Sequence, residues 1–378
     1  MKILVTCQPV VSDLRAVMPA VQALRRRGHD AVAAVPRFMH AEAATYRLDA
    51  LPAGPDWRTL KDWPGQRDWR SRADSEGDPV RQFLGEALRL RVEDLIELGR
   101  ARGVDLVLRE GADFGGSLAA EVLGVPDVAI ANTAGGRHWG ASLGGAVARL
   151  RDGYGLEPDP DFSALHRYLY VNLMPPVYDE VPTSLPNSCC YRHANAERAG
   201  ERLPDWVSDL PADRPLVVVG FGMFFHPAPL QTIVSALERV PCCAIVRVGQ
   251  GLDRFEAPPH PDTVRLVDSM PQPLLLQCAD LFVNHGGFQG IRESLSAGVP
   301  MVIRPLLDDQ PYNAQLCARL GVARSLTGPR LDAGELAGAC CEVLGDPRYR
   351  ERARAMQRAV LALPTLDELA EHLEARVA

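Results

Sequence analysis

The 378-residue sequence lacks the features that mark several large classes of protein. Its longest apolar stretch, 216–225, is too short to span a bilayer. The start, MKILVTCQPVV, runs into a polar SDLR without a small-residue cleavage site, so we expect a first strand there and no signal peptide. A net charge of −7 argues against broad nucleic-acid binding, because phosphate backbones reward clustered Lys and Arg. We therefore expect a cytoplasmic protein without a membrane span.

The cysteines lack the spacing of a metal site or a disulfide framework. There are nine, six of them in three adjacent pairs, and no CxxC occurs. This pattern favours reduced, mostly buried thiols. Asp159 and Asp161 form a nominal DxD, but they lie in a proline-rich stretch with no neighbouring strand. We expect a loop there, and no metal site.

What the chain does have is an ordinary apolar fraction of 47% and enough length for two domains. Short apolar runs alternate with segments of helical spacing, first over 2–131 and again from 216. This β-α-β order predicts an α/β protein with parallel sheets covered by helices. The polar, aperiodic segment 193–214 separates the two series. We expect domains at 1–208 and 209–360, and a C-terminal helix at 361–378 that could cross back to the first domain.

The most informative segment is FVNHGGFQGIRESLSAGVP at 282–300, which predicts a strand, a tight turn and a helix. Ligands of doubly wound folds bind beyond the carboxyl ends of the strands. Gly286 and Gly287 would let a ligand approach the backbone, and the amides of the first helical turn would point at it. With the imidazole of His285 this makes a phosphate site. The alternative is a plain turn with a capping histidine.

Two further segments belong to the same domain. LVVVGFGMFF places Gly220 and Gly222 at the end of its first strand, where they suit a diphosphate. PLLDDQPYNAQ, at 305–315, offers Asp309 and Gln310 as partners for sugar hydroxyls. In the alternative interpretation, Asp308 or Asp309 caps the next helix.

HGGFQGIRESLSAGVPMVIRPLLDDQPYNA resembles the donor-binding signature of family 1 nucleotide-sugar glycosyltransferases. It is most similar to the bacterial enzymes that decorate antibiotics and other natural products. LRRRGHDAVAAV, DLVLREGADFGGSLAAEVLGVP and VRLVDSMPQPLLLQCADLFVNHGG extend the resemblance over most of the chain. It implies a GT-B fold, with two facing Rossmann-like domains and a cleft between them. It also implies metal-independent, inverting transfer of a hexose or deoxysugar from a nucleoside diphosphate sugar, dTDP-linked, to a small natural-product aglycone. No cofactor besides that co-substrate is implied, and a homodimer is allowed.

Matching positions carry the donor site over to this chain. The resemblance implies that His285 contacts the diphosphate, that the amides of 287–290 cradle it, and that Ser269–Gln272 contacts the base. The implied donor-binding residues are Gly222, Met270, His285, Gly286, Gly287, Phe288, Gln289, Gly290, Asp309 and Gln310.

The sequence departs from the family pattern at three places. Phe288-Gln289-Gly290 replaces the serine or threonine often found after HGG. Ser269 stands where an aromatic residue often stacks on the base, and Met223 where a serine or threonine often follows the loop glycine. These departures bear on donor identity and affinity more than on the fold.

The catalytic base is expected in the loop after the first strand, where relatives commonly have a histidine in GH-x-x-P-x-x-P. With the second proline aligned on Pro19, Asp13 takes the position of that histidine, as in the enzymes of vancomycin-type pathways. The resemblance implies that Asp13 accepts the proton of the acceptor hydroxyl and that Glu110 orients it. Alternatively, Ser12 or Asp13 is a helix N-cap, His138 is the base, or an acidic acceptor needs little help.

Acceptor binding is expected in the first domain. Trp57, Trp63, Trp69 and Trp139 could stack on an aromatic aglycone, or could pin the long excursion 56–78 to the surface. Two other functions stay open: a sugar-nucleotide epimerase or hydrolase on the same fold, and a non-catalytic nucleotide-sugar-binding partner. A dehydrogenase is disfavoured because the first βα turn, CQPVVSDL, lacks GxGxxG.

Overall fold

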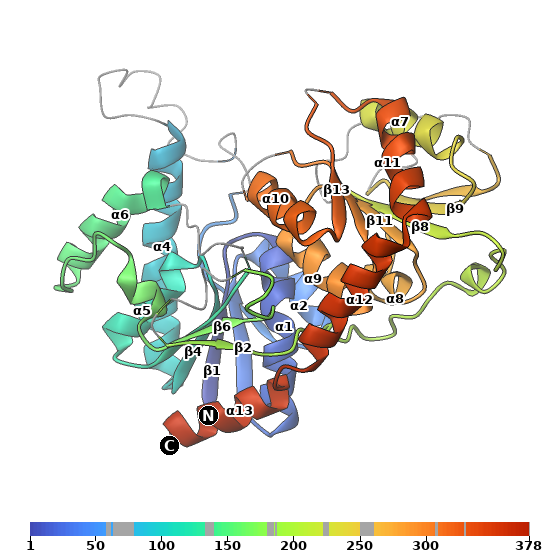
Figure 1. Cartoon of the computed structure of the whole chain (residues 1–378). Helices are drawn as coiled ribbons and strands as arrows, with labels where there is room; N and C mark the ends of the chain where they lie inside the picture. The colour runs from blue at the N-terminus through green and yellow to red at the C-terminus, as the bar shows by residue number, and fades with distance from the viewer. Residues whose placement is uncertain are drawn as a thin grey trace. The chain divides into compact units, whose positions relative to one another are not determined.

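The structure is a computed structural model, and the chain forms two compact units in it, each described by itself below. Unit 1 comprises Met1–Leu173, Glu180–Ala199 and Pro364–Ala378, and unit 2 comprises Met174–Asp179 and Gly200–Leu363. Each unit is built on one sheet with helices packed on it (Figure 1). The described residues are 1–57, 62, 79–132, 140–179, 185, 187–221, 227–249, 261–306, 309–328 and 330–377.

Unit 1 has a seven-stranded sheet in the order β3-β2-β1-β4-β5-β6-β7, and every pair is parallel. Its strands are β1 (Lys2–Thr6), β2 (Asp30–Val35), β3 (Ala50–Pro52), β4 (Leu106–Glu110), β5 (Asp127–Ile130), β6 (Leu169–Asn172) and β7 (Ser188–Cys190). Its α-helices are α1 (Val11–Arg26), α2 (His40–Thr45), α4 (Pro79–Arg102), α5 (Phe114–Leu123), α6 (Gly140–Gly153) and α13 (Leu366–Val377).

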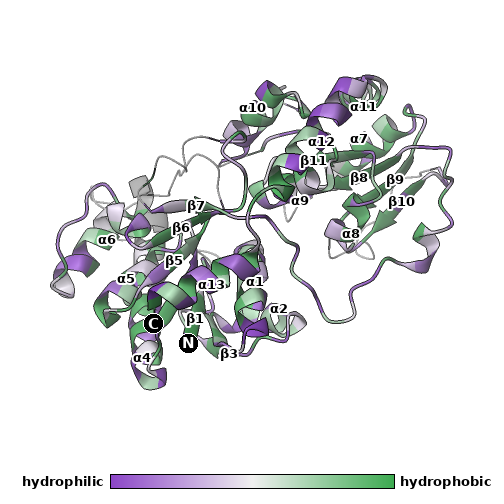
Figure 2. Cartoon of the chain, turned by 60° about the horizontal axis from the view of Figure 1, so that its bottom comes forward, coloured by the Kyte–Doolittle hydropathy of each residue, from purple (hydrophilic) through white to green (hydrophobic). Residues whose placement is uncertain are grey.

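The strands of unit 1 are apolar on both faces because helices cover both. In β1, Ile3 and Val5 pack into a cluster with α1 and α13, whereas Leu4 packs into a second cluster with α4, α5 and α6. This alternation follows from the two-residue period of a strand. A strand buried on both faces reads as a continuous apolar run, which is why KILVT predicts this position correctly. Figure 2 shows the apolar character of the strands.

Unit 2 has a six-stranded parallel sheet in the order β10-β9-β8-β11-β12-β13. Helices α7 and α11 pack against one face of it. The strands are β8 (Leu216–Gly220), β9 (Cys243–Arg247), β10 (Val264–Val267), β11 (Leu281–Asn284), β12 (Met301–Ile303) and β13 (Ala323–Ser325). The α-helices are α7 (Pro227–Leu237), α8 (Gln272–Leu276), α9 (Phe288–Ala297), α10 (Gln310–Leu320), α11 (Ala333–Gly345) and α12 (Pro347–Leu361).

The predicted α/β class with two parallel sheets is confirmed. Both sheets have the strand order of the Rossmann fold, in which successive crossovers run outward from the first strand in two directions. The units divide at 199/200 and 363/364, whereas we expected boundaries at 208/209 and 360/361. The short segment Met174–Asp179 belongs to unit 2, which the sequence pattern did not indicate. In the described part of the chain, no helix combines the length and the apolar character needed to cross a bilayer.

The last helix, α13, is part of unit 1. Leu366, Leu369 and Leu373 are buried in the same cluster as the inner face of α1. Arg27, which follows α1, forms an ion pair of 2.7 Å with Glu374. The chain thus returns to unit 1 after completing unit 2.

Candidate functional site

The carboxyl ends of β8 and β11 form the switch point of the unit 2 sheet. These strands are neighbours, and Asn284 at the end of β11 is in register with Gly220 at the end of β8. The connections from β8 to β9 and from β11 to β12 leave in opposite directions, which opens a crevice where ligands of such sheets bind. His285 follows β11 directly and therefore lies at this edge.

The turn after β11 requires glycine at two positions. Gly286 has φ +84°, and a Cβ there would lie 3.1 Å from the carbonyl oxygen of Gln310. A Cβ on Gly287 would lie 2.6 Å from Nε2 of His285. Asn284 Oδ1 accepts a hydrogen bond of 2.7 Å from the Gly286 amide and holds the turn closed. The imidazole is therefore packed against the glycine backbone at the start of α9.

Burial lowers the pKa of His285 below its usual value of 6.5, and the charge of Arg247 acts in the same direction. A hydrogen bond with the Gly220 backbone opposes this shift. The imidazole is therefore neutral near pH 7. A neutral imidazole has one N–H donor, which here serves the Gly220 backbone, and it can gain a second proton when an anion binds beside it.

The helix α9 begins after a glycine. Its N-cap is Gly287 and not His285, and Gly287 has no side chain with which to cap the first turn. The alternative of a capping histidine is therefore wrong. The backbone amides of Phe288, Gln289 and Gly290 belong to the first turn, which has no intrahelical acceptors and carries the positive end of the helix dipole. This arrangement suits an anionic group such as a diphosphate.

Side chains behind this helix terminus are tied into a buried network. Glu293, 2% exposed, accepts hydrogen bonds from Gln289 at 2.8 Å and from Gln272 at 2.7 Å. Arg292, fully buried, donates to Oε1 of Gln289, and its guanidinium lies 5.1 Å from the ring centroid of Phe288. Sequence reasoning missed Glu293 and Arg292 as partners of the site, because apolar periodicity does not mark charged residues on a buried helix face.

The segment that resembles a base-binding loop also reaches this edge. A Cβ on Gly220 would lie 3.4 Å from Cε of Met270 and 3.2 Å from Oε1 of Gln272. Ser269 is exposed. The loop between β10 and α8 therefore lies over the end of β8.

Asp309 occupies the N-cap position of α10, but its side chain makes no capping hydrogen bond. Its carboxylate accepts instead from Nδ2 of Asn313 at 3.0 Å, and the same Nδ2 donates to the Gly286 carbonyl at 2.8 Å. Gln310 Oε1 accepts from the amide of Leu306 at 2.9 Å. Asn313, which sequence reasoning missed, thus links Asp309 to the His-Gly-Gly turn. The only signal for it was its place one helical turn after Asp309.

The carboxyl edge of the unit 1 sheet brings together Asp13, Glu110 and Asn132. The N-cap of α1 is Val10, and Asp13 lies in the first turn, so the alternative that Ser12 or Asp13 is the N-cap is wrong. Asn132, just after β5, donates to Oδ1 of Asp13 at 2.8 Å. Sequence reasoning missed Asn132, which stands alone after an apolar strand.

Glu110, the last residue of β4, is 1% exposed. Burial raises its pKa well above the usual value, and the charge of Asp13 raises it further. The amide of Ala112 donates to Oε1 at 2.9 Å and opposes the shift. Burial beside Asp13 therefore favours the protonated form of the Glu110 carboxyl.

Several expected residues fall elsewhere. Trp57 is half-buried. Asp159 accepts hydrogen bonds from the amide and hydroxyl of Ser163 at 2.8 and 2.7 Å, as a turn residue does. The candidates that lie outside the described residues are Trp63, Trp69, His138, Trp139, Gly222, Met223 and Asp308.

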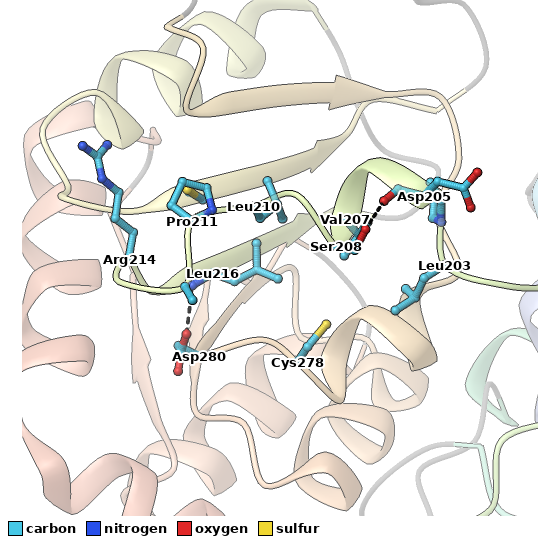
Figure 3. A pocket seen from close by; sticks show the side chains of 13 residues that line it. Leu203, Asp205, Val207, Ser208, Leu210, Pro211, Arg214, Leu216, Cys278 and Asp280 are labelled. Carbon is cyan, nitrogen blue, oxygen red and sulfur yellow. Dashed lines mark hydrogen bonds between the residues drawn. The ribbon is translucent and has the colours of Figure 1, made fainter.

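A pocket of about 570 Å³ lies at the opposite, amino-terminal edge of the unit 2 sheet (Figure 3). It is lined by Leu216 and Cys243, which begin β8 and β9, and by the segment 203–214. Asp280 accepts from the Leu216 amide at 2.9 Å and closes one end. None of the expected donor residues lines this pocket.

Comparison with known proteins finds one family match in the second half of the chain and similar enzymes along it. Residues 239–376 match the C-terminal domain family of erythromycin biosynthesis protein CIII-like proteins. The chain is 26% identical to the erythronolide mycarosyltransferase of Saccharopolyspora erythraea, over 99% of this chain and 98% of that protein. It is also 26% identical to the UDP-glucosyltransferase avaP of Aspergillus versicolor over 54% of this chain, but the match spans only 47% of avaP.

Solved structures of glycosyltransferases have the same fold as this chain. The glycosyltransferase VinC, determined in complex with DTDP, superposes with a TM-score of 0.80 at 24% identity, covering 100% of this chain and 99% of that one. The same two-sheet architecture is therefore present in both. Over nearly its whole length the chain is therefore similar to a glycosyltransferase of antibiotic biosynthesis, and its two-sheet α/β architecture is that of GT-B glycosyltransferase structures.

Proposed function

We propose that this chain transfers a deoxysugar, with inversion, from a dTDP-linked sugar to a small natural-product aglycone. The observation that carries the proposal is the arrangement of His285 and the α9 N-terminus at the switch point of unit 2. There, His285 follows β11 and the uncapped N-terminus of α9 presents its amides. The named activity of the mycarosyltransferase relative and the nucleotide bound to VinC support the sugar and the nucleoside.

In the proposed reaction, the acceptor oxygen attacks the anomeric carbon from the side opposite the diphosphate. The new C–O bond forms as the bond to the diphosphate oxygen breaks, and the leaving group takes the electron pair. The amides of α9, and the imidazole of His285 once it has taken up a second proton, stabilise the charge that develops on the diphosphate. No resident cofactor takes part in this scheme.

The acceptor proton is assigned to Asp13. The hydrogen bond from Asn132 holds its carboxylate, and an ionised carboxylate can accept a proton as the acceptor oxygen attacks. The raised pKa of Glu110 favours its neutral form, which reduces the electrostatic repulsion between its carboxyl group and that of Asp13. Asp309 and Gln310 are assigned to the sugar hydroxyls.

The first test is a panel of nucleoside diphosphates and their sugars, scored by thermal stabilisation and then by turnover. A bound ligand raises apparent stability by mass action. Because the proposed donor is dTDP-linked, we expect dTDP to raise the melting temperature more than UDP, GDP or ADP does. His285→Ala should reduce turnover by about two to three orders of magnitude, as removal of an oxyanion donor does, while the melting temperature without ligand changes little. Turnover close to wild type in His285→Ala would refute the diphosphate assignment.

Asp13→Asn tests the base. We expect kcat to fall by about 10² to 10⁴ with the KM for donor unchanged, because the amide keeps the shape and loses the proton acceptor. Unchanged rates across pH would remove Asp13 from this role.

Conversion of the nucleotide sugar without any acceptor would favour an epimerase or hydrolase, and binding without release of diphosphate would indicate a non-catalytic partner.

A further inference from the structure

The connection between β6 and β7 contains six residues that leave unit 1. Strands β6 and β7 both belong to unit 1, but Met174–Asp179 between them belongs to unit 2. We call this segment the strap. Within unit 2, the strap contacts α9 and α10. These helices follow the His-Gly-Gly turn and the segment that carries Asp309.

Tyr178 is the buried aromatic residue of the strap. It is 2% exposed, and its ring lies against that of Phe288, the first residue of α9, with the ring centroids 5.9 Å apart and the planes at 39°. Its hydroxyl is 3.9 Å from Sγ of the buried Cys317 on α10. The next strap residue, Asp179, accepts a hydrogen bond of 3.3 Å from the hydroxyl of Tyr312, also on α10.

Phe288 therefore has an aromatic ring packed against it and a cation over it. The second contact is the guanidinium of Arg292, 5.1 Å from the ring centroid. Phe288 is itself 4% exposed. A side chain held in this way fixes its own backbone, and the Phe288 amide is one of those that the α9 N-terminus presents. Pre-organised donors bind a ligand without a cost of reordering.

We infer that Tyr178 is a positioning residue of the donor site, which orients the diphosphate-binding amides of α9 by packing on Phe288. The inference rests on the proposed function, because it takes the α9 N-terminus to be the diphosphate site. Tyr178 does not touch the reacting atoms. Its effect is carried by the ring, whereas the hydroxyl serves only to seat the strap beside α10.

The test compares Tyr178→Leu with Tyr178→Phe by calorimetric binding of dTDP and of UDP. Aromatic pairs contribute modestly beyond their burial, so Tyr178→Leu should weaken dTDP binding about three- to tenfold. Tyr178→Phe keeps the ring and should bind within about twofold of wild type. In steady state, the KM for donor should rise in Tyr178→Leu, while the KM for acceptor stays within about twofold.

Tyr191→Leu is the matched control. Tyr191 is also a buried tyrosine, 6% exposed, but it lies in unit 1 and bonds to His372 at 2.8 Å. This variant should lose stability without losing dTDP affinity. If Tyr178→Leu does not fold, Phe288→Leu removes the same ring pair from the other side and should give the same loss.

Three results would overturn the inference: wild-type dTDP affinity in folded Tyr178→Leu, equal losses in Tyr178→Phe and Tyr178→Leu, or an equal loss in Tyr191→Leu. Failure of the proposed function looks different. In that case the wild-type chain binds neither dTDP nor UDP, or His285→Ala binds dTDP as tightly as wild type does.

Discussion

His285 is the residue whose charge state should change most when a diphosphate binds. Burial lowers its pKa, so the imidazole is neutral at pH 7.5 in the free protein. An adjacent diphosphate favours the protonated form and raises that pKa. Binding is then linked to proton uptake, and the affinity for dTDP should increase as the pH falls from about 7.5 towards 5.5.

His285→Asn separates this effect from protonation of the nucleotide itself. The wild-type affinity should rise with falling pH more steeply than that of the variant, by at most about one decade per pH unit for a single proton. Calorimetry in two buffers of different ionisation heat measures the proton uptake directly. Identical pH dependence in the two proteins would show that His285 does not meet the diphosphate.

The raised pKa of Glu110 should make the free energy of unfolding depend on pH. Its pKa is raised in the folded protein, so the folded state binds a proton that the unfolded state releases above about pH 4.3. The free energy of unfolding therefore decreases as pH rises through the range between the two pKa values. Glu110→Gln resembles the protonated side chain and keeps the acceptor for the Ala112 amide.

Urea unfolding at pH 5 and pH 8 checks this. We expect Glu110→Gln to show a smaller decrease in the free energy of unfolding between these pH values than wild type does. A decrease of the same size in both proteins would contradict the protonated state of Glu110.

The residues of the site were only partly predictable from the sequence. Motif and resemblance pointed to His285, Asp309 and Asp13, because each stands in or beside a recognisable pattern. Asn132 and Asn313 could not be found in this way. Each is a lone amide whose role depends on which strand end or helix lies next to it, and that neighbour is set by strand order.

At the scale of elements, the turn between β11 and α9 depends on a backbone conformation that only glycine adopts without strain. Gly286→Ala places a Cβ at φ +84° and against the Gln310 carbonyl. The free energy of unfolding should fall by about 1–3 kcal/mol, and the affinity for dTDP should fall as well, because the turn positions His285 and α9.

Gly124→Ala is the control for the backbone cost. Gly124, after α5, has φ +70°, with nothing within 4 Å of the added Cβ. It should lose stability without a change in dTDP affinity. Equal dTDP affinity in the two variants would mean that the turn does not shape the donor site.

The elements were predicted best where the pattern is long or buried on both faces. Strands β1, β8 and β11 read as uninterrupted apolar runs. Strands β3, β6, β7, β10 and β13 were not predicted, because these short segments are not marked by an apolar run bounded by helical patterns and do not stand out from a loop. Their existence depends on pairing with neighbours that the sequence alone does not identify.

At the scale of the whole molecule, the core of unit 1 includes a helix from the far end of the chain. Leu373 on α13 is fully buried in the cluster with α1. Leu373→Ala should lower the free energy of unfolding of unit 1 by about 2–5 kcal/mol. Leu361→Ala, at a side chain 51% exposed at the end of α12, should change it by less than about 0.5 kcal/mol.

Differential scanning calorimetry with and without dTDP can assign the effect to a unit. Leu373→Ala should shift the transition that dTDP does not stabilise directly. If the variant shifted only the dTDP-sensitive transition, α13 would belong energetically to unit 2. In the sequence, only the interruption at Pro364 sets α13 apart from the preceding helix. Composition does not show which of the two cores a helix joins.

The return of α13 has a consequence for the order in which the protein can be completed during synthesis. Domains emerge from the ribosome from the N-terminus onward and generally fold as units. Here the part of α1 that packs against α13 stays uncovered while all of Gly200–Leu363 is translated. At about 5–20 residues per second, that delay is on the order of ten seconds or more. For that interval the nascent chain exposes an apolar face that a chaperone could occupy, and unit 2 has the chance to fold before unit 1 is finished.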